Sequence, residues 1–311
     1  MSVTSRNCKM GYYTLIICIG LLAHFRSHAQ SVNQTESPLQ PEPVVSLDTV
    51  DWIHGSSNCE NLKNEPDYQE WQPIQYQNNT YIFRQNKCSH YEGPFVYLFV
   101  GLERGLLIDT GATIEGGGKL LELVRNLTNL PILVVHSHGH SDHRLGDDAF
   151  RNAEGISVVD VGQSAVQEYF GFSNWPYESV AIELGGREIQ MLPVPGHSDD
   201  DLAYYDALTE TMVTGDTLYP GRLYVRNWSE YRESIGRLAQ WLRDKSISNV
   251  LGTHIEMSSV PDIDYPVGTT FQPDEHQLPL GVEDIYLLGE ALEKIETPER
   301  IPLGSYIIWP I

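Results

Sequence analysis

Short apolar segments alternate with amphipathic ones over most of the chain. The runs at 95–100 (FVYLFV), 132–136 (ILVVH) and 250–253 are rich in β-branched and aromatic residues and are bounded by glycine or polar residues, which is typical of buried β-strands. Between such runs, as in 229–243 and 282–295, apolar residues recur at helical spacing. The pattern predicts an α/β fold.

The other predicted elements continue this alternation. We expect further strands at 105–109, 156–161, 179–184, 187–194, 202–205 and 211–214, and further helices at 119–127 and 164–170. Strands and helices that alternate in two similar halves predict two sheets packed face to face, with helices on the outside.

The start of the chain has a different character. Arg6 and Lys9 precede an apolar run at 11–23, and small residues stand at the −3 and −1 positions of a cut after Ala29. This pattern predicts a signal peptide over 1–29 and a secreted or periplasmic protein. The alternative is an uncleaved membrane anchor, although a spanning helix needs about 20 apolar residues and this run is shorter.

The next segment, 30–50, is rich in Gln, Ser, Pro and Glu and lacks periodicity, which predicts a disordered tether. We expect a single domain over 51–311, with an N-terminal extension before the regular pattern begins near Thr80. The chain has 20 Lys+Arg against 42 Asp+Glu, a formal charge of −22. Such acidity argues against nucleic acid or a membrane surface as a partner and leaves a small-molecule substrate. The oligomeric state cannot be inferred from these patterns.

Two of the four cysteines, Cys8 and Cys18, lie in the predicted leader. Cys59 and Cys88 form an even pair in a protein expected in an oxidising compartment, so we predict a disulfide between them. The alternative is two separate buried thiols.

The stretch HSHGHSDH at 136–143 carries the candidate chemistry, because it directly follows a predicted buried strand. Its candidate metal ligands are His138, His140, Asp142 and His143. Imidazoles with a carboxylate are the ligand set expected of Zn²⁺ or a similar metal. Four ligands in six residues do not fit comfortably around one ion, so the spacing favours two divalent ions. His136 fits neither ion and is expected to be a buried, hydrogen-bonded histidine.

Three further candidates, His197, Asp216 and His254, each follow a predicted strand and stand beside a glycine. A glycine there lets the backbone turn sharply at the strand end. One such histidine alone is more often a surface or satisfied core residue. Seven ligand-type side chains at successive strand ends together argue for a metal centre.

The pattern H-x-H-x-D-H, followed by His, Asp and His at widening intervals, resembles the metallo-β-lactamase-fold metallo-hydrolase superfamily from about Thr80 to His254. The resemblance implies a four-layer αββα sandwich. It also implies a first metal on His138, His140 and His197, a second on Asp142, His143 and His254, and Asp216 between them. Asp109 matches an early family aspartate that braces the ligand loop. The alternative for Asp109 is a turn carboxylate that binds backbone amides.

The resemblance implies hydrolysis by a metal-bridging hydroxide, with Asp142 as the catalytic residue that orients it or shuttles its proton. We therefore expect a secreted hydrolase with two divalent ions, most simply Zn²⁺, that cleaves an ester, lactone, thioester or amide. The alternatives are a β-lactamase, a phosphodiester or sulfate ester hydrolase, and an iron-dependent redox member of the same fold. No clear lysine near His254 would receive a β-lactam carboxylate.

The segment 219–228 after Asp216 offers candidate substrate-binding side chains. We expect Tyr219 or Tyr224 to donate a hydrogen bond to the reacting oxygen and Arg222 to bind a substrate carboxylate. Arg144, beside His143, is a similar candidate. The alternative for all four is local packing and surface charge.

The motif around His197 departs from the family pattern. The acids Asp199, Asp200 and Asp201 follow Ser198, and the expected glycine is missing. This departure argues against the glyoxalase II branch and the true β-lactamases. Three consecutive acids either repel anionic substrates or form a solvated loop or helix cap.

Overall fold

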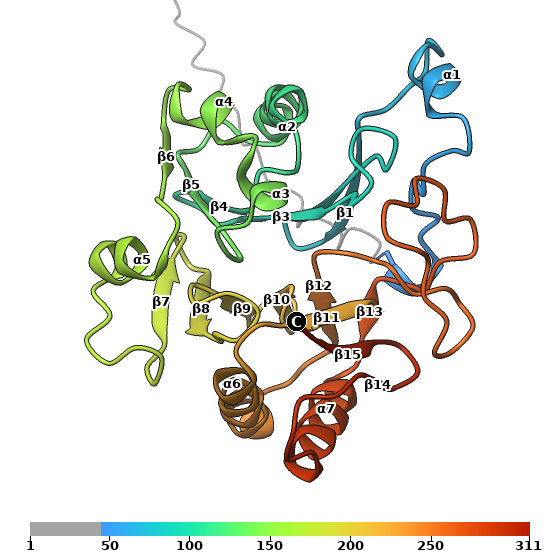
Figure 1. Ribbon diagram of the computed structural model, residues 1–311. Helices are drawn as coiled ribbons and strands as arrows, with labels where there is room; N and C mark the ends of the chain where they lie inside the picture. Colours follow the sequence, from blue (N-terminus) through green and yellow to red (C-terminus); the bar gives the residue numbers. More distant parts are fainter. Residues whose placement is uncertain (1–44) are drawn as a thin grey trace, which may run out of the picture. The chain divides into compact units, whose positions relative to one another are not determined.

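Two six-stranded sheets lie face to face in the computed structural model, which describes residues 45–311 (Figure 1). The predicted leader over 1–29 and the tether up to residue 44 lie outside the described residues. None of the helices within 45–311 has the length and apolar character needed to cross a bilayer.

The first sheet is built from the N-terminal half of the described chain. Its strands, in spatial order, are β1 (Trp71–Gln77), β2 (Thr80–Gln85), β3 (Phe95–Val100), β4 (Gly105–Ile108), β5 (Ile132–Val135) and β6 (Ile156–Val158). Neighbouring strands are antiparallel from β1 to β4, and β4, β5 and β6 run parallel.

The second sheet is built from the C-terminal half. Its strands, in spatial order, are β13 (Pro279–Leu280), β12 (Asn249–Gly252), β10 (Thr211–Gly215), β9 (Leu202–Asp206), β8 (Glu188–Pro193) and β7 (Val180–Glu183). A third sheet, which the sequence did not predict, contains β11 (Arg222–Val225), β15 (Ile307–Pro310) and β14 (Ile301–Pro302).

Helices cover the outer faces of both large sheets. The helices are α1 (Cys59–Lys63), α2 (Ile114–Leu127), α3 (Ser141–Arg144), α4 (Asp147–Arg151), α5 (Gln163–Phe170), α6 (Trp228–Trp241) and α7 (Val282–Lys294), with single 3₁₀ turns at Leu47–Thr49 and Leu242–Asp244. Helices α2 and α4 lie on the first sheet, and α6 and α7 lie on the second (Figure 1). The predicted four-layer αββα sandwich is confirmed.

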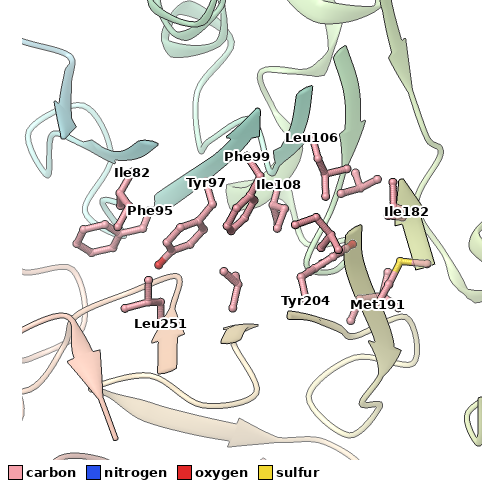
Figure 2. Packing of buried hydrophobic residues seen from close by; sticks show 14 of the residues in the cluster. Ile82, Phe95, Tyr97, Phe99, Leu106, Ile108, Ile182, Met191, Tyr204 and Leu251 are labelled. Carbon is pink, nitrogen blue, oxygen red and sulfur yellow. The ribbon is translucent and has the colours of Figure 1, made fainter. Parts of the chain in front are cut away.

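The main core lies between the two sheets because side chains alternate along each strand. On β3, Phe95, Tyr97 and Phe99 point inward toward the second sheet, where they join residues such as Met191 and Tyr204 (Figure 2). The intervening residues of β3 pack outward against α2 and α4. Strand β3 is therefore buried on both faces, which explains its continuous apolar run.

Helix α2 begins at Ile114, before the predicted position 119, and includes the glycine run. The Thr113 side chain caps it by accepting the backbone N–H of Gly116 at 3.0 Å. A Cβ on Gly117 would lie 2.3 Å from the Cα of Gly146, so only glycine permits this close approach. The glycines therefore let α2 pack directly against the backbone that follows α3.

Residues 45–50, which composition assigned to the tether, belong to the folded unit. Leu47 is buried in the core between the sheets, and the Val45 N–H donates to the Tyr76 carbonyl at 3.3 Å. The predicted disulfide is present between Cys59 on α1 and Cys88 in the β2–β3 loop.

Candidate metal centre

All seven candidate ligands meet at one edge of the two sheets. Strand β10 is parallel to β12, and both β8 and β10 are antiparallel to β9, so β8, β10 and β12 run in the same direction. Their carboxyl ends therefore carry His197, Asp216 and His254 to the same edge. The remaining four ligands are His138 and His140 in the loop after β5, and Asp142 and His143 on α3.

Three imidazoles form the first cluster, which we call the histidine group: His138, His140 and His197. The His138 Nε2 lies 2.8 Å from His140 Nδ1 and 3.2 Å from His197 Nε2. Burial lowers the pKa of His138 well below its usual value and also lowers the pKa of His140 and His197. The three rings are therefore neutral near pH 7, which is the state in which imidazole binds a metal.

The second cluster, which we call the mixed group, contains Asp142, His143, Asp216 and His254. The Asp142 Oδ2 lies 3.3 Å from His143 Nε2 and 3.4 Å from His254 Nε2. The Asp216 Oδ1 lies 3.3 Å from His254 Nε2, and its Oδ2 lies 3.5 Å from His197 Nε2 in the histidine group. Asp216 therefore lies between the two groups, as the family resemblance implied.

Electrostatics distinguish the mixed group from the histidine group. Burial opposes the charge of His254, but the carboxylates of Asp216 and Asp142 outweigh it and raise the pKa of His254 to about 9. The same balance, with Asp142 first among the carboxylates, raises the pKa of His143 well above its usual value. A divalent ion bound by the mixed group would have to replace these protons.

The outer ring nitrogens of three histidines are held by acceptors. Nδ1 of His143 donates to Oδ2 of Asp109 at 3.0 Å, and Nδ1 of His197 donates to the Tyr224 carbonyl at 2.8 Å. Nδ1 of His254 faces the Glu92 carbonyl at 3.3 Å. Each contact leaves Nε2 facing the centre of the cluster, where its lone pair can bind a metal once the ring is neutral. This arrangement fits divalent metal ions, since metal-binding histidines usually donate their second N–H in this way.

Asp109 combines the two roles that the sequence left open. Besides contacting His143, its Oδ1 accepts the backbone N–H of Ser137 at 2.7 Å. Sequence analysis missed the contributions of Glu92 and Tyr224 to the centre. Both act through backbone carbonyls, and because every residue has a carbonyl, the residue type carries no signal.

His136 is a buried, hydrogen-bonded histidine outside both groups, as predicted. Its Nε2 lies 2.9 Å from Oδ1 of Asp147, which also accepts a hydrogen bond from the Thr110 hydroxyl at 2.8 Å. The pair connects β5 to α4 and does not contact the candidate ligands.

A cleft of about 410 Å³ opens beside both groups. Ligand side chains from both groups form part of its wall. The other lining residues include Tyr91, Glu92, Tyr219, Tyr224, Arg226, Glu256 and Val267. The candidate metal centre is therefore accessible to a small molecule.

Arg222 does not have the substrate-binding role that we expected. It is buried, and its guanidinium donates to Glu256 at 2.5 Å, to Asp264 at 2.8 Å and to the Tyr224 hydroxyl at 2.8 Å. Strand β11 turns this side chain toward the loop after β12, where two carboxylates neutralise it. No substrate carboxylate is needed to balance its charge.

Two other expected substrate residues also have structural partners. The buried Tyr219 hydroxyl donates to the Arg222 carbonyl, so its proton is already engaged within the protein. Arg144 is exposed, does not line the cleft, and donates from Nε to the Gly139 carbonyl at 2.8 Å. Tyr224 remains a candidate, because its hydroxyl accepts from Arg222 and keeps its own proton for donation.

Two of the three acids after His197 are buried and belong neither to a solvated loop nor to a charged screen, whereas Asp199 is exposed. Asp200 is buried and accepts the backbone N–H groups of Gly139 at 3.2 Å and Gly162 at 2.8 Å. Asp201 is buried and accepts the backbone N–H of Ser198 at 2.6 Å. These two carboxylates hold the backbones of the ligand loops.

Comparison with known proteins supports the family that the sequence motif resembles. The model of the metallo-beta-lactamase superfamily matches residues 92–245. A hydroxyacylglutathione hydrolase from Chelativorans sp. (strain BNC1) is 24% identical over 124 residues, which cover 39% of this chain and 48% of that protein. The chain thus spans about half the length of this curated relative.

Solved structures share the fold at low sequence identity. A metallo-beta-lactamase from Pontibacter korlensis superimposes with a TM-score of 0.53 at 17% identity, covering 72% of this chain and 100% of that one. A metallo-beta-lactamase from Pseudomonas aeruginosa in its mono-zinc form superimposes with a TM-score of 0.53 at 14% identity, covering 74% of this chain and 98% of that one. With the fold, the seven clustered candidate ligands and the family match together, the chain belongs to the metallo-beta-lactamase superfamily.

Proposed function

We propose that the protein is a hydrolase that holds two divalent metal ions and cleaves an acyl bond of a small substrate. The observation that carries this proposal is that two ligand groups, joined by Asp216, open on one cleft. Nitrogen and carboxylate donors without cysteine suit Zn²⁺ and similar borderline ions. The histidine group would hold one ion and the mixed group the other.

Ions bound there would lower the pKa of a coordinated water and polarise a substrate carbonyl. Asp142 lines the cleft and has Oδ2 against both His143 and His254. This position supports the proposal that its carboxylate orients the attacking water and takes its proton. The Tyr224 hydroxyl accepts from Arg222 and lines the cleft, which supports a role for it as a hydrogen-bond donor to the substrate.

The choice of an acyl bond is supported by the relatives and by the cleft. Several curated relatives are named hydroxyacylglutathione hydrolase, a name that denotes cleavage of an acyl bond. The missing glycine after His197 is the reason that we do not extend the proposal to their substrate. Arg226 is the one Lys or Arg among the described lining residues, which gives little support for a phosphodiester or sulfate ester.

We also propose that the protein is secreted or periplasmic. The disulfide between Cys59 and Cys88 supports this location, because disulfides persist mainly in oxidising compartments.

The test is a screen of the zinc-loaded protein against esters, lactones, thioesters, β-lactams and phosphodiesters. We expect acyl hydrolysis by the wild type, and a loss of about 100-fold or more in kcat/KM for His138→Ala. His276→Ala is the matched control, because this half-buried histidine lies outside both groups, and it should keep full activity. Equal activity in wild type and His138→Ala would contradict the proposal, and one tightly held iron would favour the redox alternative.

A further inference from the structure

Arg226 gives the cleft a positive charge. It lies directly after β11, and its backbone N–H donates to the Gly196 carbonyl at 3.0 Å, next to His197. Its side chain is exposed and lines the cleft. Within residues 45–311, no carboxylate lies at ion-pairing distance from its guanidinium, although the chain as a whole carries a net charge of −22.

Three of the four acidic side chains in the cleft wall already have partners. Glu256 is paired with Arg222 at 2.5 Å, and Asp142 and Asp216 belong to the mixed group. Glu92, the fourth, does not lie at ion-pairing distance from Arg226. The charge of Arg226 therefore remains available to an anion that enters the cleft.

Val267 gives the same cleft an apolar surface. It lies in the long connection between β12 and β13 and has 66% of its surface exposed. An apolar side chain beside a reactive centre gains free energy when a ligand covers it.

The connection that presents Val267 is anchored on both sides. Asp264 accepts from Arg222 at 2.8 Å, and Glu275 pairs with the buried Arg84. Phe271 forms a backbone bridge to Gly55, which places this connection beside the segment that leads to α1 (Figure 1). Val267 is therefore held in place as a wall of the cleft before any substrate arrives.

We infer that the substrate is an amphipathic anion whose carboxylate binds Arg226 and whose apolar group packs on Val267; this inference rests on the proposed acyl hydrolysis. A guanidinium binds a carboxylate through two parallel hydrogen bonds, which fixes orientation as well as position. With the carboxylate at Arg226 and the apolar group at Val267, the acyl bond lies in the cleft that both ligand groups line.

The test compares two thioesters with the zinc-loaded protein: S-hexanoyl-3-mercaptopropionate, which carries a carboxylate, and its neutral primary amide. We expect kcat/KM to be about 10- to 100-fold higher for the carboxylate, mainly through KM. Arg226→Gln should remove this preference. Arg243→Gln should keep it, because Arg243 is equally exposed but does not line the cleft.

A second pair of variants tests the apolar wall. Val267→Ala should reduce the preference for the hexanoyl over the acetyl thioester several-fold. Val260→Ala should leave it unchanged, because Val260 is exposed on the same connection outside the cleft. Equal hydrolysis of the carboxylate and the amide would overturn the inference and leave the proposed function intact. Hydrolysis of neither would contradict the proposed function itself.

Discussion

Asp109 and His143 are joined by a hydrogen bond of 3.0 Å between Oδ2 and Nδ1, and the other Asp109 oxygen holds the backbone of Ser137. The Asp109 backbone has a φ of +70°, in the left-handed region that aspartate and asparagine tolerate better than most residues. One fully buried carboxylate thus orients a candidate ligand ring and fixes the start of the ligand loop.

Asp109→Asn tests this relationship without straining the backbone. The amide keeps an acceptor for Ser137 but presents an N–H to His143, so the ring loses its acceptor. We expect the affinity for Zn²⁺ to fall about 10- to 100-fold, measured by competition with a chromophoric chelator.

Asp147→Asn is the control for this experiment, because Asp147 makes the same kind of contact with His136 outside both ligand groups. It should bind zinc as the wild type does. An unchanged affinity in Asp109→Asn would show that Asp109 does not support the metal centre.

Replacement of Arg222 should affect stability before substrate affinity. Arg222→Met would leave Glu256 buried without its cation, so we expect a loss of about 3–5 kcal/mol in the free energy of unfolding, measured by urea denaturation. Arg243→Met, at an exposed arginine without an ion-pair partner in the described part of the chain, should cost less than about 0.5 kcal/mol. Full stability with a raised KM in Arg222→Met would restore Arg222 as a substrate-binding residue.

The disulfide closes a loop between residues separated by 29 positions. Replacing both Cys59 and Cys88 with serine should lower the free energy of unfolding by about 3 kcal/mol, because the unfolded chain gains freedom. A reducing agent should lower the stability of the wild type to the level of the double variant and leave the variant unchanged. Identical stability of the two proteins without reductant would contradict this prediction.

The buried Lys87 should make the free energy of unfolding depend on pH. Its buried amine donates to the carbonyls of Tyr91 at 2.9 Å and Glu92 at 3.2 Å, and burial together with nearby Arg84 lowers its pKa to about 8. The unfolded chain holds this proton up to a pKa near 10.4, so it binds more protons than the folded chain between these values. Below pH 8, the cost of burying the charged amine lowers the free energy of unfolding by its full amount. This cost disappears as the pH rises toward 10.4.

The measurement compares wild type with Lys87→Met by denaturant unfolding at several pH values. Relative to the variant, the wild type should gain about 2 kcal/mol of unfolding free energy between pH 7.5 and 9.5. The neutral amine retains two N–H groups, so both hydrogen bonds persist. A difference that stays constant or falls with pH would show that Lys87 keeps its ordinary pKa.

The parts of the fold that could be predicted are those whose pattern is local. Phe95–Val100 is buried on both faces and reads as a continuous apolar run. Trp71–Gln77 was not predicted, because its outer residues are polar and Pro73 interrupts the pattern. The third sheet pairs residues 222–225 with 307–310, a contact between short segments that no local periodicity reveals.

The candidate metal centre was more predictable than the candidate substrate site for a physical reason. Side chains that bind metal ions come from a few residue types, here His and Asp, so these types and their positions at strand ends carry a signal. Arginine binds protein carboxylates and substrate carboxylates equally well, and the partners of Arg222 lie 34 and 42 residues away. Only the folded structure shows that Arg222 is paired with protein carboxylates, whereas Arg226 forms no ion pair within residues 45–311.

The central claim is that the histidine group and the mixed group each hold a divalent ion. Zinc bound per chain, measured by elemental analysis after dialysis against trace zinc, tests it most directly. The wild type should retain two zinc ions, and His143→Ala should retain one in the histidine group. A wild type that binds no zinc, or a His143→Ala protein that still holds two ions, would contradict the account.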